Sequence, residues 1–262
     1  MCELLGMSAN VPTDICFSFA GLLERGGNTG PHRDGWGITF YEGKGCRTFK
    51  DSKPSCESTV ANLVRDYPIK SCAVISHIRQ ANRGRVCLEN THPFSRELWG
   101  KNFTYAHNGQ LSGYTSQLKT KRFSPVGNTD SELAFCWILD QVSQRYPEKP
   151  KNMLVVFNYI AKLADQLRQF GVFNMLMSDG EHLIAYCSNH LSWITRRAPF
   201  GEARLADTDW IIDFKKETTP NDIVTVIATK PLTTNEAWET MQPGEFKVFK
   251  LGEVVSGKKI DK

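Results

Sequence analysis

The chain has 262 residues, of which 40% are hydrophobic and 23% charged, a composition typical of a folded protein with a substantial core. Its net charge of +4 is spread along the chain without a basic block, which argues against nucleic acid as a partner. No apolar run approaches the roughly 18 residues of a membrane span, and no signal peptide is recognisable. The sequence therefore predicts no membrane association.

The cysteines indicate a reducing compartment. The chain has eight cysteines, enough for four disulfides, but their spacing is irregular and no CxxC pattern occurs. Without an export signal, such cysteines are typical of reduced cytosolic thiols. We therefore expect a cytoplasmic protein, with Cys136 and Cys187 inert because they lie in apolar stretches.

The N-terminal third of the chain predicts alternating strands and helices. Residues 2–8 form an apolar run typical of a strand, and Asp14 is placed to cap the helix that follows. The apolar face of this helix would hold Ile15, Phe19, Leu22 and Leu23. The later elements of this third are a hairpin of strands 38–41 and 46–50 turning at Gly43–Gly45, a helix over 57–67, and a strand over 71–78 that ends on Arg79.

The rest of the chain predicts two helices between groups of strands. Residues 103–106 predict a strand that ends before Asn108-Gly109. Thr129 and Glu132 have the spacing of a capping box, which opens a helix, and a second helix is expected over 152–170. The strands expected after these helices are a hairpin of 172–178 and 182–187 around Asp179-Gly180, then strands at Trp193, 210–214, 223–229 and 246–251.

This order of elements indicates a mixed α and β fold. Hairpins outnumber β-α-β units, so the sheets should be largely antiparallel. No linker, internal repeat or low-complexity segment interrupts the chain, and we expect residues 1–262 to form a single domain.

The most distinctive residue for chemistry is Cys2. If Met1 is removed, Cys2 carries both a thiol and a free α-amine. An α-amine titrates at roughly 7.7–8.0 and a cysteine thiol at roughly 8.5, so near pH 7 the amine can accept the thiol proton. One residue would then supply both the nucleophile and its base.

Several motifs follow Cys2 in a fixed order. They are DGWG at 34–37, HIRQAN at 77–82, THPF at 91–94, YAHNG at 105–109 and GNTDSE at 127–132. In residues and order, the chain resembles the class-II glutamine amidotransferases, and most closely their stand-alone bacterial, YafJ-type members. The resemblance covers essentially the whole chain. It implies the N-terminal-nucleophile fold, an αββα sandwich of two mostly antiparallel sheets between helical layers.

The resemblance also implies a role for each matching residue. Cys2 would be the nucleophile, with the Asn108 side chain and the Gly109 backbone N–H forming the oxyanion hole. Arg79 would bind the α-carboxylate of glutamine, and Asp130 would bind its α-ammonium. These roles suit the chemistry, because amide cleavage builds negative charge on oxygen and Arg presents a forked donor to a carboxylate.

Two features of the resemblance leave the substrate open. Synthase-linked members commonly have Thr-His where this chain has Asn82-Arg83, so Asn82 is a candidate substrate-binding residue and γ-glutamyl compounds other than glutamine become plausible. The glycine-rich loop at 26–30, together with 34–37, lies where the family has a segment that covers glutamine.

The function expected from the resemblance is hydrolysis of glutamine through a γ-glutamyl thioester, releasing ammonia and glutamate. An acceptor for ammonia would come from a partner or synthase protein, or the enzyme would be a simple amidohydrolase. The alternatives are a γ-glutamyl peptide or conjugate hydrolase, and a non-catalytic binding or regulatory module. The histidines at 77, 92 and 107 lack HxH or HxxxH spacing, so we expect no metal and no cofactor.

Overall fold

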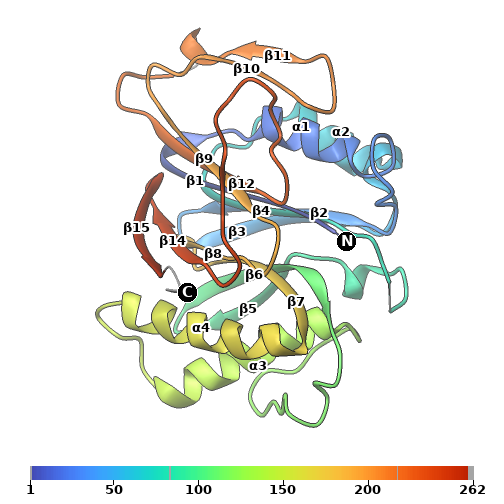
Figure 1. Cartoon of the computed structure of the whole chain (residues 1–262), viewed down its shortest axis with the longest axis vertical. Coiled ribbons are helices and arrows are strands. Elements are labelled where there is room, and N and C mark those ends of the chain that lie inside the picture. Colours follow the sequence, from blue (N-terminus) through green and yellow to red (C-terminus); the bar gives the residue numbers. More distant parts are fainter. Residues whose placement is uncertain (1, 83, 217, 259–262) are drawn as a thin grey trace.

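Two β-sheets pack face to face, and a pair of helices covers the outer face of each (Figure 1). The computed structural model describes residues 2–82, 84–216 and 218–258, so Met1 and Arg83 lie outside the described residues. Every strand pairing among them is antiparallel. The predicted αββα sandwich of mostly antiparallel sheets is therefore confirmed.

The first sheet has seven strands and carries the N-terminus. Its strands in spatial order are β13 (Glu239–Thr240), β9 (Ser192–Arg197), β12 (Ile223–Ala228), β1 (Glu3–Thr13), β4 (Ser71–Ile78), β2 (Trp36–Glu42) and β3 (Gly45–Asp51). Strand β1 is central and lies between β12 and β4. The residue that precedes β1, Cys2, is thereby fixed beside the end of β4.

The second sheet has six strands. In spatial order they are β15 (Glu253–Lys258), β14 (Phe246–Lys250), β8 (Leu183–Tyr186), β7 (Gly171–Ser178), β6 (Lys101–Leu111) and β5 (Phe94–Leu98). The predicted hairpin around Asp179-Gly180 is the pair β7–β8. Leu4 of β1 and Leu176 of β7 belong to the buried layer between the two sheets.

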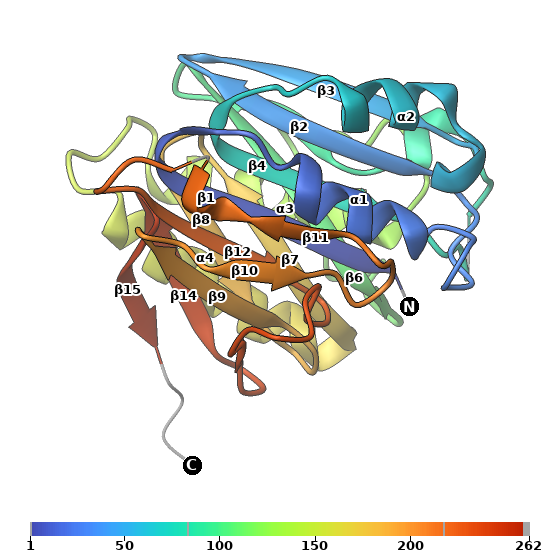
Figure 2. The same ribbon diagram turned by 90° about the horizontal axis from the view of Figure 1, so that it is seen from above.

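Helices α1 (Cys16–Glu24) and α2 (Thr59–Asp66) cover the first sheet, and α3 (Asp130–Arg145) and α4 (Leu154–Leu167) cover the second. Their apolar faces form the two outer cores. The predicted face of α1 is confirmed, since its four named residues are all at most 4% exposed. A short ribbon of β10 (Glu202–Arg204) and β11 (Ile211–Asp213) lies against α1 (Figure 2), where Phe17 contacts Trp210 and Phe214 edge to face.

The helix starts differ in how well the sequence predicted them. Helix α3 begins as expected, with the Thr129 side chain accepting a bond from the N–H of Glu132 at 3.2 Å. The Glu132 carboxylate does not return the bond to Thr129; it accepts from Gly127 and Arg96 instead. The predicted N-cap of α1, Asp14, is wrong by one position, because the N-cap residue is Ile15. The Asp14 carboxylate still accepts a hydrogen bond from the N–H of Cys16, the first residue of the helix.

The main correction concerns β6. The sequence predicted a strand over 103–106 that ends before Asn108-Gly109, but β6 continues to Leu111. Asn108 and Gly109 pair with Asn174 and Phe173 of β7. An Asn-Gly pair favours a turn only locally, and here the ladder to β7 outweighs that preference. Strands β5, β10, β13 and β15 were not predicted.

Candidate active site

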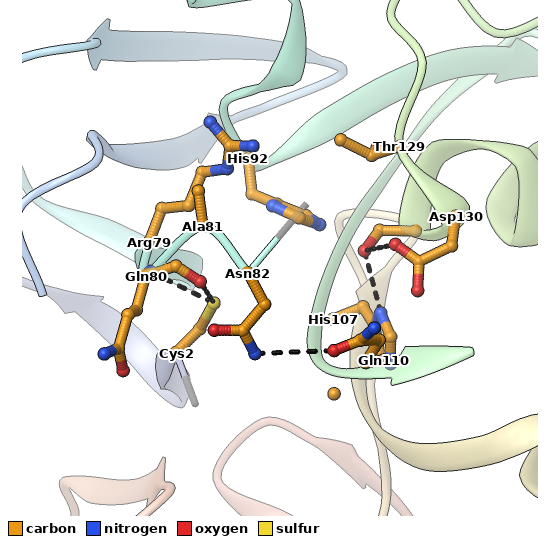
Figure 3. A pocket seen from close by; sticks show the side chains of 12 residues that line it. Cys2, Arg79, Gln80, Ala81, Asn82, His92, His107, Gln110, Thr129 and Asp130 are labelled. Atoms are coloured by element: carbon orange, nitrogen blue, oxygen red, sulfur yellow. Dashed lines mark hydrogen bonds between the residues drawn. The ribbon is translucent and has the colours of Figure 1, made fainter. Parts of the chain in front are cut away.

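A pocket opens where the start of β1, the end of β4, the end of β6 and the start of α3 meet (Figure 3). It holds about 410 Å³ of space not filled by protein atoms, and this figure includes open solvent at its mouth. The predicted site residues that line it are Cys2, Arg79, Asn82, Gly109 and Asp130. These five come from segments far apart in the sequence, and the fold brings them to one place.

Cys2 is partly buried at the pocket floor beside Gln80. The backbone N–H of Gln80 donates to Cys2 Sγ at 3.3 Å, and the thiol lies 3.5 Å from the Gln80 carbonyl oxygen. Burial raises the pKa of the Cys2 thiol, whereas the bond from Gln80 and the charge of Arg79 act in the opposite direction. The sulfur can therefore become a thiolate only with help from a base.

Arg79 is held rigidly at the end of β4. Its backbone N–H donates to the carbonyl of Gly35 at 2.8 Å, and its own carbonyl accepts from the N–H of Asp34 at 3.1 Å. The Asp34 carboxylate in turn accepts from the N–H of Ala81 at 2.7 Å. The guanidinium, 4% exposed for the residue as a whole, donates from Nη1 to the carbonyl of Arg85 at 3.0 Å. The DGWG motif thus fixes the segment that presents the arginine.

Asp130 faces the pocket from its opposite wall (Figure 3). One carboxylate oxygen, Oδ2, accepts from the backbone N–H of Leu111 at 2.7 Å, and the other lies 3.5 Å from the Ser131 hydroxyl. Because Leu111 ends β6, this bond ties the start of α3 to the strand that carries Asn108 and Gly109. A guanidinium and a carboxylate on facing walls can bind a ligand that carries both charges.

Gly109 also lines the pocket. Its position has no room for a side chain. A Cβ atom at this position would lie 1.8 Å from the carbonyl oxygen of Val172 and 2.7 Å from Nε2 of His107. Both contacts are far below van der Waals distance, so a side chain would push β6 away from β7. The close approach of these two strands therefore requires glycine.

Asn108, by contrast, does not line the pocket. Its side chain is fully buried, with Nδ2 3.3 Å from the hydroxyl of Thr229. The Asn108 carbonyl accepts from the side chain of Asn174 at 3.0 Å. Asn174 is itself fixed by the backbone N–H groups of residues 188–190. Asn108 is thus directly behind the Gly109 position, held at both its backbone and its side chain.

The buried histidines form a neutral cluster beside the pocket. The rings of His77 and His92 are in contact, with 4.1 Å between their centroids and a tilt of 36°, and Nε2 of His77 lies 3.2 Å from the carbonyl of His107. Burial lowers the pKa of His77 to about 3 and that of His92 well below its usual value. Both ring nitrogens of His92 are buried and lack a hydrogen-bond partner among the described residues.

Sequence reasoning missed several residues of the pocket. They are Gln80, Ala81, His92, His107, Gln110, Thr129 and Ser131. Asn82 contacts Gln110, with Nδ2 3.5 Å from Oε1, and His107 contacts Ser131 at 2.8 Å. The missed residues flank predicted ones in the chain or, like His92, stand in a recognised motif, and that proximity was the only available signal.

Three further findings concern the loops near the site, metal-binding groups and membrane spans. None of residues 26–30 or 34–37 lines the pocket. Asp34 and Gly35 connect to it through their hydrogen bonds with the Arg79 segment. In the described part of the chain, no three His, Cys, Asp or Glu side chains are grouped as a metal site would need. No helix there is long and apolar enough to cross a membrane.

A family model described as "Glutamine amidotransferases class-II" matches residues 1–262. Among curated proteins, the chain is 71% identical over 255 residues to YafJ of Escherichia coli strain K12, by its name a proposed glutamine amidotransferase. That match covers 97% of this chain and 100% of YafJ. A Haemophilus influenzae protein with the same proposed function in its name is 46% identical, over 98% of this chain and 86% of its own length.

Solved structures show the same fold. A predicted glutamine amidotransferase from Pseudomonas aeruginosa has a TM-score of 0.78 and 50% identity, covering 97% of this chain and all of its own. The glutamine phosphoribosylpyrophosphate amidotransferase of Bacillus subtilis has a TM-score of 0.63 at 16% identity. This chain matches 49% of that longer protein, which supports a shared fold alone.

Proposed function

The chain belongs to the class-II glutamine amidotransferases, and on this premise we propose that it cleaves the carboxamide of glutamine, or of another γ-glutamyl compound, through Cys2. The observation that carries the proposal is the convergence of Cys2, Arg79, Asn82, Gly109 and Asp130 on one pocket. Each of these residues suits one part of a γ-glutamyl amide, and their sequence positions alone give no reason for them to meet.

The first step requires a base for the buried thiol. After removal of Met1, the α-amine of Cys2 accepts the thiol proton. The thiolate attacks the amide carbon, and the carbonyl electrons move to oxygen. Burial raises the pKa of the thiol, so the thiol needs a base at neutral pH, and we assign that role to the α-amine of Cys2.

The second step requires donors for the new negative charge. The backbone N–H of Gly109 and the amide of Asn108 are the proposed donors. When the tetrahedral intermediate collapses, the C–N bond breaks and the proton held by the amine passes to the departing nitrogen. Ammonia leaves, and the γ-glutamyl group remains on Cys2 as a thioester. Water then cleaves the thioester to glutamate and restores the thiol.

The head group determines which amides bind. Arg79 and Asp130 face each other across the pocket, and we assign the α-carboxylate to the arginine and the α-ammonium to the aspartate. Asn82 lies between Cys2 and Gln110, where it can contact the reacting amide. Synthase-linked members commonly have a threonine at the position of Asn82. Because of this difference, γ-glutamyl conjugates are candidate substrates beside glutamine.

The proposal is tested by an assay of processed protein, with N-terminal sequencing to confirm that Cys2 is the first residue. Ammonia and glutamate should form in equal amounts from glutamine, and a panel of γ-glutamyl amides should release amine and glutamate. Cys2→Ser is the matched control, because the hydroxyl is a much weaker nucleophile. If the processed protein releases neither ammonia nor amine from any member of the panel, the proposal fails and a binding module becomes the better interpretation.

A further inference from the structure

Thr229 follows the last residue of β12 and contacts the side chain of Asn108, a proposed oxyanion donor. The residue is 5% exposed, and its hydroxyl oxygen lies 3.3 Å from Nδ2 of Asn108. The same oxygen accepts the backbone N–H of Leu4 at 2.9 Å, and the N–H of Thr229 donates to the carbonyl of Leu4 at 3.1 Å. One hydroxyl therefore joins the strand that follows Cys2 to the side chain of Asn108.

Among the described residues, the Thr229 hydroxyl is the hydrogen-bond partner of the Asn108 side-chain amide. Its other end, Oδ1, is buried without a hydrogen-bond partner among the described residues, and the residue is 0% exposed. A side-chain amide whose oxygen has no partner can rotate unless its nitrogen is held by a hydrogen bond. A donor that rotates stabilises the transition state less than one held in a fixed direction. The Thr229 hydroxyl is the group that supplies this restraint.

The restraint works in either orientation of the amide. With Nδ2 toward Thr229, one of its two hydrogens is bound to the hydroxyl and the second remains free. With Oδ1 toward Thr229, the hydroxyl donates its proton to that oxygen and both amide hydrogens are free. In both cases the plane of the amide is set by Thr229, and at least one donor remains for an oxyanion.

The segment that carries Thr229 is itself anchored. Arg25, 7% exposed, donates to the carbonyls of Lys230 at 3.2 Å and Pro231 at 2.7 Å, and its guanidinium contacts the Glu3 carboxylate at 3.1 Å. Glu3 is adjacent to the nucleophile in sequence. One buried arginine, Arg25, thus connects the residue that follows Cys2 to the two residues that follow Thr229.

We propose that Thr229 is a positioning residue of the reaction: its hydroxyl orients the Asn108 amide toward the oxygen of the tetrahedral intermediate and fixes it relative to the strand of Cys2. This proposal rests on the function proposed above. It adds a residue that lies 121 positions from Asn108 and takes no direct part in bond making.

The decisive variant is Thr229→Val, which keeps the branched shape and removes the hydroxyl. We expect kcat to fall about 10- to 100-fold, a fraction of the 10²–10³ that a lost oxyanion donor costs, with KM within about threefold of wild type. Thr229→Ser keeps the hydroxyl and should retain kcat within about threefold. The matched control is Thr225→Val. Thr225 is a buried threonine of β12, the strand that leads to Thr229, and its hydroxyl donates to the carbonyl of Gly252. The kcat of this variant should be unchanged.

A double-mutant cycle with Asn108→Ala separates positioning from a general loss of structure. If Thr229 acts through Asn108, adding Thr229→Val to Asn108→Ala should lower kcat by less than about twofold. Melting temperatures identify variants that fail to fold, in which case Thr229→Ala, a smaller side chain without the hydroxyl, replaces valine. A folded Thr229→Val that keeps more than half of wild-type kcat, or a double variant with fully multiplied losses, overturns the proposal. Inactive wild-type protein would instead overturn the proposed function itself.

Discussion

The backbone N–H of Gln80 points at the sulfur of Cys2, with 3.3 Å between nitrogen and sulfur. Gln80 follows Arg79 in the chain. The donor to the nucleophile is therefore adjacent to the residue that we propose binds the substrate's carboxylate. A hydrogen bond to sulfur favours the thiolate, while burial raises the thiol pKa. The fold therefore gives Cys2 a poised but protonated thiol.

This arrangement predicts selective labelling of Cys2. In protein without Met1, the glutamine-like electrophile 6-diazo-5-oxo-norleucine should modify Cys2 well before the other seven cysteines. Cys2 lines the pocket and has the α-amine as a base, whereas Cys136 and Cys187 are fully buried and out of reach of the reagent. Peptide mapping by mass spectrometry identifies the labelled site, with Cys2→Ser as the control. Labelling mainly at Cys136 or Cys87 would rule out the assignment.

Asn108→Ala tests the oxyanion role directly. The change removes a neutral donor aimed at charge that exists only in the transition state, so kcat should fall by roughly 10²–10³-fold with little change in KM. Because Asn108 is fully buried, the variant will also lose some stability. Turnover must therefore be expressed per titrated active site, beside a melting curve. A folded variant with more than half of wild-type kcat is incompatible with an oxyanion role.

The sequence predicted the fold and five of the residues that line the pocket. Cys2, Arg79 and Asp130 each mark the start or end of an element, where local patterns are informative, and their expected roles came from the resemblance to the family. The position of Asn108 in its strand was mispredicted, because pairing of β6 with β7 is a tertiary effect that the Asn-Gly propensity does not contain. Thr229 has no local signal at all: its importance depends on the approach of β12 to β1 and β6.

The head-group assignment predicts a specific pattern of losses. Arg79→Lys keeps the charge but loses the fork, and Asp130→Asn removes the charge while keeping an acceptor for the N–H of Leu111. Both should raise KM for glutamine more than they lower kcat.

A substrate analogue provides the matching test from the ligand side. The monoamide of glutaric acid has the γ-amide and a carboxylate but no α-ammonium, so it should be a poor substrate for wild type. Its kcat/KM should change little on Asp130→Asn, since the lost charge has no partner in that ligand. Equal turnover of glutamine and the monoamide by wild type would exclude this role for Asp130. Melting curves control for the helix start, because Asp130 also opens α3.

The neutral histidine cluster predicts a loss of stability in mild acid. Burial lowers the pKa of His77, His92 and His107, so the unfolded chain binds protons near pH 6.5 while the folded protein does not. Stability is therefore complete above pH 6.5 and decreases as the pH falls below it. A histidine that stays neutral in the folded protein contributes a slope that approaches about 1.4 kcal/mol per pH unit below pH 6.5.

His77→Gln isolates one member of this cluster that does not line the pocket. The pKa of His77 is about 3, so its contribution extends from pH 6.5 down to that value. Urea unfolding at pH 6.0, 5.5 and 5.0 should show a slope of unfolding free energy against pH that is shallower than wild type by about 1.4 kcal/mol per unit. The exposed His190 is the matched control, and His190→Gln should leave the slope unchanged. The variant also loses the contact with the carbonyl of His107, which lowers the free energy of unfolding by the same amount at every pH. A comparison of slopes removes this constant difference. A wild-type slope in His77→Gln would mean that His77 is protonated in the folded protein, contrary to its burial.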